Sequence, residues 1–157
     1  MEEALVIKKI IEKGLTIALA ESCTGGLVSG AITAVPGSSE CFGYGVVTYS
    51  NEAKNKLLNV PWEVLEKYGA VSPETAVLMA QGVRRLAKSD IGLSITGIAG
   101  PSGGSAEKPV GLVYLAFANE TACICEKFHF LGNRYEVRMS TARQAFDMIW
   151  HYGVLPR

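Results

Sequence analysis

Residues 15–34, LTIALAESCTGGLVSGAITA, decide the fold class of this chain. Residues 15–20 form a short apolar run that suits a buried strand, and residues 27–34 are apolar enough for a helix packed on a sheet. The glycine-bearing turn Glu21–Gly26 lies between them. A strand that ends in a tight turn and feeds a helix places that turn at the carboxyl edge of the sheet, where open α/β sheets bind ligands. We therefore expect an α/β fold with a small-molecule site at this turn.

The remaining sequence continues the alternation of strands and helices. Further strands are predicted at residues 42–49, 91–96, 110–118 and 121–130, the last two joined as a hairpin at Asn119-Glu120. Helices are predicted from residue 4 to a stop at Gly14, and at residues 27–34, 51–58, 61–67, 72–87 and 134–150. No repeat or linker divides the chain. We predict one domain over residues 1–157, a three-layer α/β/α arrangement with helices flanking a central mixed sheet of about five strands.

The composition of the chain limits the kinds of partner that it can have. The chain has 157 residues, of which 48% are hydrophobic, and its 15 Lys+Arg balance its 15 Asp+Glu. A net charge of zero gives no broad basic field for a nucleic-acid backbone. Apolar runs such as Leu112–Ala118 are far shorter than a membrane span, and the acidic start MEE is unlike a signal peptide. We expect no nucleic-acid or membrane partner.

The four cysteines indicate a reducing compartment. They lack the paired CxxC spacing of zinc sites and are too sparse for a disulfide framework, so we expect a cytoplasmic protein. No HExxH motif, aspartate-rich loop or Cys/His cluster indicates a metal. We expect neither a metal nor an organic cofactor.

The turn at residues 21–26 offers a nucleophile. Ser22 or Thr24 would be exposed at the sheet edge, beside backbone N–H groups of Gly25 and Gly26 that can hold an anion or oxyanion. The alternative is that Thr24 only caps the helix and Ser22 lies beside it.

Cys23 is an alternative nucleophile in the same turn, because helix N-termini favour thiolates. Its usual partner is a histidine, and the chain has only His129, in the predicted hairpin, and His151, near the C-terminus. A Cys–His pair is therefore disfavoured, and a small packed residue is the simpler interpretation of Cys23.

The segment from Thr48 to Lys54 offers a base. The predicted strand delivers Tyr49 at its carboxyl end, and a helix starting at Ser50 or Asn51 places Lys54 one turn in, toward the Glu21–Gly26 turn. Lysine acts as a base only where desolvation lowers its pKa toward neutrality. The alternative is an ordinary solvated lysine.

Two further features suit an anionic ligand. The loop Gly97–Gly104 has neither the P-loop nor the GxGxxG pattern, yet Gly97, Gly100, Gly103 and Gly104 permit close approach of a phosphate or ribose. Arg134 lies at the start of the last predicted helix, against the helix dipole. An anionic ligand would explain that position, and so would a simple surface arginine.

Seven ordered blocks then carry a family resemblance: AESCTGG (20–26), VPGSS (35–39), GVVTYSNEAK (45–54), YGAVS (68–72), TGIAGPSGG (96–104), EKPVG (107–111) and GNRYEVR (132–138). Together they closely resemble the competence/damage-inducible CinA C-terminal domain family. The resemblance implies nicotinamide-mononucleotide amidohydrolase activity, with a serine, a lysine base and an assisting tyrosine that correspond to Ser22, Lys54 and Tyr49. It also implies substrate contacts at Thr96 and Arg134.

The combined hypothesis is a Ser-Lys amidohydrolase acting on nicotinamide mononucleotide. Its expected substrate-binding residues are Thr24, Gly25, Gly26, Thr96, Gly97, Gly100, Gly103, Gly104 and Arg134. Some family members carry an additional N-terminal domain, and we expect this chain to act without one, as a homo-oligomer. Two alternatives stay open: a non-catalytic nucleotide- or partner-binding module linked to competence or DNA damage, and an amide hydrolase acting on another carboxamide.

Overall fold

A five-stranded mixed sheet forms the centre of the molecule in the computed structural model, which describes residues 2–155. The strand order is β2-β1-β3-β4-β5. β2, β1 and β3 are parallel, and β4 and β5 run antiparallel to their neighbours. The strands are β1 (Ile17–Glu21), β2 (Phe42–Val47), β3 (Ile91–Gly97), β4 (Leu112–Ala118) and β5 (Cys123–His129). The predicted α/β class and mixed sheet are confirmed.

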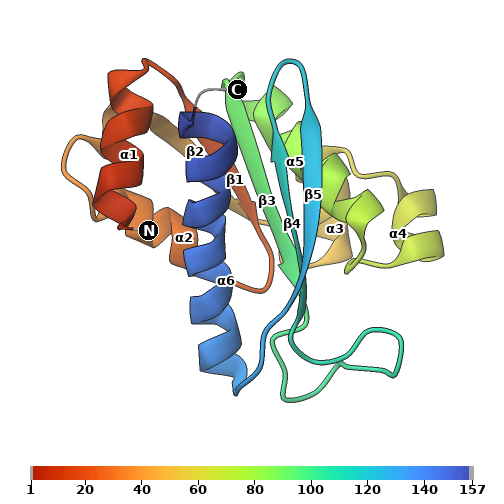
Figure 1. Cartoon of the computed structure of the whole chain (residues 1–157). Coiled ribbons are helices and arrows are strands. Elements are labelled where there is room, and N and C mark those ends of the chain that lie inside the picture. Colours follow the sequence, from red (N-terminus) through yellow and green to blue (C-terminus); the bar gives the residue numbers. More distant parts are fainter. Residues whose placement is uncertain (1, 156–157) are drawn as a thin grey trace.

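Helices cover both faces of this sheet, as Figure 1 shows. On one face lie α1 (Glu3–Glu12), α2 (Leu27–Thr33) and α6 (Arg134–Ile149). On the other lie α3 (Asn51–Leu58), α4 (Trp62–Tyr68) and α5 (Pro73–Ala87). A short 3₁₀ turn at Ser38–Glu40 and a π-helical turn at Trp150–Val154 complete the described elements.

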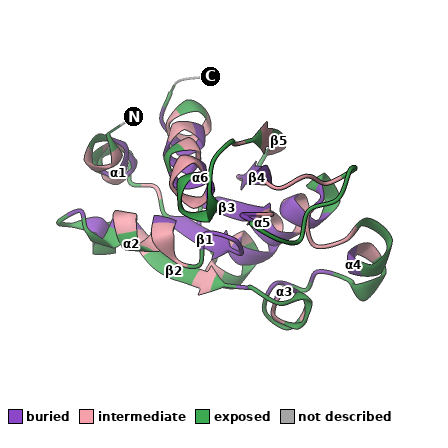
Figure 2. Cartoon of the chain, turned by 90° about the horizontal axis from the view of Figure 1, so that it is seen from below, coloured by how far each residue is buried: buried purple, intermediate pink, exposed green. Residues whose placement is uncertain are grey.

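Burial on both faces explains why the central strands are apolar throughout. Every residue of β1 is buried, and in Figure 2 β1 and β3 are coloured as buried between the two helical layers. The larger apolar cluster joins the sheet to α1, α2 and α6 through residues such as Leu19, Phe117 and Phe146. A smaller cluster lies under α5, around Met79 and Val83. Parallel strands covered by helices on both faces read as continuous hydrophobic runs.

The hairpin between β4 and β5 differs from the sequence-based expectation. The connection is residues 119–122 rather than Asn119-Glu120 alone, because the Asn119 side chain accepts hydrogen bonds from the N–H groups of Thr121 and Ala122. β4 also begins two residues later than predicted. Gly111, with φ of 90°, turns the chain just before Leu112.

The parallel strands position the site. β1, β2 and β3 end at the same edge of the sheet, at Glu21, Val47 and Gly97. Three segments therefore meet there: the turn after β1, the start of α3 and the loop after β3. None of the helices within residues 2–155 combines the length and apolarity needed to cross a bilayer.

Candidate active site

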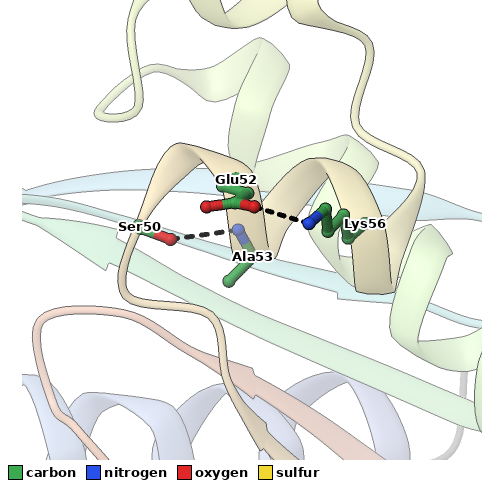
Figure 3. A network of polar contacts seen from close by, with 4 residues as sticks. All are labelled: Ser50, Glu52, Ala53 and Lys56. Atoms are coloured by element: carbon green, nitrogen blue, oxygen red, sulfur yellow. Dashed lines mark hydrogen bonds and ion pairs between the residues drawn. The ribbon is translucent and has the colours of Figure 1, made fainter.

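Helix α3 turns one lysine into the protein and leaves another in solvent. Ser50 is its N-cap, and the Ser50 hydroxyl accepts a 3.0 Å hydrogen bond from the N–H of Ala53 (Figure 3). Lys56 pairs with Glu52 at 2.5 Å on the solvent side of the helix (Figure 3). Because Lys54 lies two residues earlier, it occupies the opposite face, and its exposed fraction is 0%. The interpretation of Lys54 as an ordinary solvated lysine is wrong.

The Lys54 amine has three oxygen partners. Its Nζ lies 2.8 Å from the carbonyl oxygen of Thr48, 3.3 Å from that of Tyr49 and 3.1 Å from the hydroxyl oxygen of Ser22. A neutral amine has two N–H bonds and one lone pair. The two carbonyls can only accept, so they take the two N–H bonds and leave the lone pair for the Ser22 hydroxyl.

Burial shifts the charge state of this amine. Desolvation lowers the pKa of Lys54 from 10.5 to about 8, because the charged form loses its hydration. Within residues 2–155 no carboxylate forms an ion pair with Lys54 that would restore the charged form. A general base must be neutral to accept a proton, and the lowered pKa makes the neutral form of Lys54 accessible near neutral pH.

Ser22 is held at the end of β1. Its N–H donates to the carbonyl of Ile95 at 3.0 Å, which extends the pairing of β1 with β3 by one residue. Its side chain lines a cavity of about 340 Å³. That volume lies in the range of small-molecule sites.

Most of the predicted site residues line this cavity. Its lining includes the predicted residues Ser22, Tyr49, Lys54, Thr96, Gly97, Gly100, Gly103 and Arg134. It also includes residues that the sequence did not single out for the ligand: Cys23, Ala70, Val71, Ile98, Ala99 and Ser102. These come from the turn after β1, the segment between β2 and α3, helix α3, the segment before α5, the end of β3 with the loop after it, and the start of α6.

Sequence comparison identifies the family. Residues 1–152 match the family model described as the CinA C-terminal domain. The chain belongs to the CinA C-terminal domain family. It is 57% identical over 150 residues to a competence-damage inducible protein of Caldanaerobacter subterraneus subsp. tengcongensis. It is 52% identical over 147 residues to a CinA-like protein of Geotalea uraniireducens. These matches cover 96% and 94% of the chain but 36% and 35% of the relatives, so the chain spans about a third of their length.

Solved structures share the fold of this CinA domain. The competence/damage inducible protein CihA from Agrobacterium tumefaciens has a TM-score of 0.91 at 41% identity, over 96% of this chain and 95% of that chain. The competence damage-inducible protein A (ComA) from Klebsiella pneumoniae subsp. pneumoniae has a TM-score of 0.93 at 29% identity, with both chains covered completely. The resemblance and the fold class predicted from the sequence are confirmed.

Tyr49 and Arg134 both line the cavity of this CinA domain and contact each other. Arg134 donates one hydrogen bond to the carbonyl of Gly100 at 2.8 Å and another to the hydroxyl of Tyr49 at 3.0 Å. The Tyr49 side chain is 60% exposed. Its hydroxyl therefore faces Arg134, and its backbone carbonyl is the part that contacts Lys54.

The predicted anion donors Gly25 and Gly26 are engaged elsewhere. The N–H of Gly25 donates to the carbonyl of Ser22 at 3.1 Å, and that of Gly26 donates to the carboxylate of Glu21 at 3.0 Å. Both glycines line a separate cavity of about 580 Å³ between α2 and α6. The expectation that they contact the ligand beside Ser22 is corrected, because Glu21 already occupies this helix end.

Thr24 and Gly104 also lie outside the Ser22 cavity. The interpretation of Thr24 as the cap of α2 is wrong: the N-cap is Gly26, and the Thr24 hydroxyl is buried without a hydrogen-bond partner in the described chain. Gly104 packs closely on Val110 instead of facing the cavity.

Thr96 lines the cavity but uses its hydroxyl hydrogen structurally. The hydroxyl donates to the carbonyl of Ala70 at 2.7 Å and so ties the end of β3 to the segment before α5. Only its oxygen lone pairs are left for a ligand.

Cys23 is a poorly activated thiol. Burial raises its pKa to about 11, since the thiolate would lose its hydration. The ring of His129 contacts the carbonyl of Val110 at 3.0 Å on the β5 side of the molecule. The interpretation of Cys23 as a packed thiol agrees with its position in the larger apolar cluster. Across residues 2–155, no three His, Cys, Asp or Glu side chains are arranged to hold a metal ion.

Proposed function

We propose that this CinA domain is an amidohydrolase that converts nicotinamide mononucleotide to nicotinate mononucleotide and ammonia through a serine acyl-enzyme. The observation that carries the proposal is the 3.1 Å contact between the Ser22 hydroxyl and a buried Lys54 amine whose pKa is lowered to about 8. A serine hydroxyl becomes an effective nucleophile when a positioned base removes its proton. The carboxamide substrate comes from the family resemblance carried by residues 20–26, 45–54 and 96–104.

The first half-reaction forms the acyl-enzyme. Neutral Lys54 takes the Ser22 proton while Ser22 Oγ attacks the carboxamide carbon, and the carbonyl π pair moves onto the oxygen. Lys54 then gives the proton to the amide nitrogen, the C–N bond breaks and ammonia leaves. The positive pyridinium ring withdraws electrons from the carboxamide and makes its carbon more electrophilic.

The second half-reaction releases the acid. With ammonia gone, water attacks the ester carbon and Lys54 takes its proton. Lys54 then protonates Ser22 Oγ as the C–O bond to the enzyme breaks. The product is nicotinate mononucleotide, and Lys54 is neutral again for the next cycle.

The oxyanion has two candidate donors. Among the described residues, the N–H groups of Cys23 and Thr24 donate to no other residue. Cys23 directly follows Ser22 and lines the cavity, which is the usual place for an oxyanion donor. Each such donor contributes roughly 3–4 kcal/mol in comparable sites.

We assign the phosphate of the substrate to the end of the cavity away from Ser22. Arg134 supplies a guanidinium there, and the loop after β3 has Gly100 and Gly103 at φ of 81° and 89°. Glycine at such angles brings backbone close to a ligand. Binding energy from the phosphate would hold the carboxamide in place over Ser22.

The test is ammonia release from nicotinamide mononucleotide by the purified chain, with nicotinate mononucleotide identified as co-product. We expect turnover by the wild type, and a loss of about 10³-fold or more in Ser22→Ala and Lys54→Ala. Near wild-type rates in either variant would contradict the dyad. Tight nucleotide binding by calorimetry with no ammonia would favour a non-catalytic module, and a panel of other carboxamides would reveal a different amide substrate.

A further inference from the structure

Glu21 connects the end of β1 to the start of α2. Its exposed fraction is 0%, and its carboxylate accepts hydrogen bonds from the N–H groups of Gly26, Val28 and Ser29 at 3.0, 3.2 and 2.8 Å. The Ser29 hydroxyl adds a fourth bond at 2.7 Å. Helix α2 has no side-chain cap at its own N-cap, Gly26. The Glu21 carboxylate supplies that cap from five residues away.

The backbone of Glu21 also reaches the partners of Lys54. The Glu21 carbonyl accepts the N–H of Thr48 at 2.9 Å, and the carbonyl of Thr48 accepts from Lys54 at 2.8 Å. One residue thus fixes the end of β1, the start of α2 and the segment that orients the amine. We call residues 22–25, which lie between these anchor points, the Ser22 turn.

Arg138 holds the Ser22 turn from another side. It projects from α6, where its Nε donates to the carbonyl of Cys23 at 3.1 Å and its Nη2 donates to the carbonyl of Thr24 at 2.8 Å. In the part of the chain that the structure describes, Arg138 has no carboxylate partner. Neither Glu21 nor Arg138 lines the Ser22 cavity.

Two contacts with the carbonyls of the turn determine where its free N–H groups point. In a trans peptide the N–H lies opposite the carbonyl of the same unit. The Ser22 carbonyl is held by the N–H of Gly25, and the Cys23 carbonyl by Arg138. The N–H groups of Cys23 and Thr24 belong to these two peptide units, so they point away from Gly25 and Arg138.

We propose that Glu21 and Arg138 are positioning residues that fix the Ser22 turn from outside the cavity. They keep the Ser22 hydroxyl at hydrogen-bond distance from Lys54, and they keep the N–H groups of Cys23 and Thr24 free for the oxyanion. The catalytic part of this inference rests on the proposed function. The placement of the turn rests on the contacts above.

Arg138→Gln is the main test variant, because Arg138 is only partly buried and its loss should leave the fold intact. Arg143→Gln is the matched control. Arg143 lies on the same helix and, like Arg138, lines the cavity between α2 and α6, but it makes no hydrogen bond to the turn. Arg138→Lys tests partial rescue, since one ammonium cannot reproduce the guanidinium fork. Glu21→Gln serves as a second variant, with its melting temperature measured to check folding.

Two readouts separate the inference from the proposed function. The first is the pair of steady-state constants, kcat and KM, for nicotinamide mononucleotide. The second is the rate at which diisopropyl fluorophosphate labels Ser22, followed by intact mass with Ser22→Ala as the blank. Labelling needs an activated and positioned Ser22 and requires no amide substrate.

We expect Arg138→Gln to lower kcat and the labelling rate together by roughly 10- to 100-fold, because small displacements of a reacting group have effects of this size. KM should stay within about 3-fold, Arg138→Lys should be intermediate, and Arg143→Gln should match the wild type. Unchanged labelling in Arg138→Gln, a rise in KM alone, or a wild type that is not labelled at Ser22 would each overturn the proposal. Labelling that falls as expected in a chain releasing no ammonia would support the positioning role and refute the proposed function alone.

Discussion

The Nζ of Lys54 lies 3.1 Å from the Oγ of Ser22, although the two residues are 32 positions apart in the chain. The contact forms because β1 and β2 are parallel neighbours that end at the same sheet edge, where Ser22 follows one and the cap of α3 follows the other. The two backbone carbonyls beside Lys54 then orient its amine toward the hydroxyl. The proposed chemistry depends on this pair.

Activity should rise with pH as Lys54 loses its proton. We expect kcat/KM for nicotinamide mononucleotide to reach half its maximum near pH 8 and to level off above it, since the pKa of Lys54 is about 8. Initial rates of ammonia release between pH 6 and 10 check this. The control is Lys56→Gln, because Lys56 is exposed on the same helix and its variant should keep the wild-type profile. A flat or falling profile would contradict a lysine base.

Lys54 should also give folding stability a distinct pH dependence. Its pKa is about 8 in the folded chain and near 10.5 when unfolded, so between these values the unfolded state binds the extra proton. Below pH 8 the native state bears the full cost of burying a charge, and this cost is relieved as pH rises. Relative to Lys54→Met, the unfolding free energy of the wild type should increase by on the order of 2–3 kcal/mol from pH 7 to 10.5.

Urea denaturation at several pH values measures this difference. Lys56→Met provides the control, and it should show no comparable trend relative to the wild type. A constant difference between wild type and Lys54→Met over this range would mean that the pKa of Lys54 is the same in the folded and the unfolded chain.

Tyr49→Phe should affect substrate binding more than the chemical step. The Tyr49 hydroxyl contacts Arg134, while its backbone carbonyl, which the substitution keeps, contacts Lys54. We expect KM to rise by roughly 3- to 10-fold, while kcat stays within about 3-fold of the wild type. Steady-state kinetics checks this. A turnover rate that drops about 100-fold at constant KM would instead mean that the hydroxyl relays the proton.

Arg134 should make the protein prefer a substrate that carries a phosphate over one that lacks it. We expect the wild type to prefer nicotinamide mononucleotide over nicotinamide riboside by about 100-fold or more in kcat/KM, and Arg134→Gln to reduce that preference to about 10-fold or less. Comparing both substrates in both proteins separates phosphate recognition from a general loss of activity. Arg143→Gln should keep the wild-type ratio, and an unchanged ratio in Arg134→Gln would place the phosphate elsewhere.

Thr96→Val should destabilise the domain. The variant removes the bond to the carbonyl of Ala70 at a site where Thr96 is buried, so we expect a loss of about 1–2 kcal/mol in unfolding free energy. Urea denaturation measures it, with Thr96→Ser as the variant that keeps the hydroxyl. Equal stability of all three proteins would show that this hydrogen bond contributes nothing.

Local patterns are enough to predict most of the fold and to place Ser22 and Lys54 near the same edge of the sheet. The apolar run, turn and second apolar run at residues 15–34 predict a strand, a turn and a helix close to the observed β1 and α2. The helix predicted at residues 51–58 has its observed bounds, because Ser50 is a typical N-cap and that start determines which face carries Lys54. The spacing of residues in the sequence does not decide whether Lys54 is buried or solvated. The family resemblance is needed to favour the buried position.

The anchoring of the Ser22 turn is not visible in the sequence. Glu21 is predicted only as the first residue of a turn, because a side chain that caps a helix five residues later leaves no short-range signature. Arg138 reaches a turn more than a hundred residues earlier in the chain, and only the packing of α6 beside α2 brings them together. Contacts of this kind depend on how elements pack, which hydrophobic periodicity does not specify.

The most direct test of a neutral, positioned lysine is the pKa of Lys54 itself, measured by NMR on protein labelled with ¹³C at the lysine side chains and assigned with Lys54→Met. We predict that the lysine signal missing from the variant titrates near pH 8 in the wild type. A Lys54 that titrates near its ordinary value of 10.5 would contradict the account, because its amine would then carry a proton at the pH values where it is proposed to act as the base.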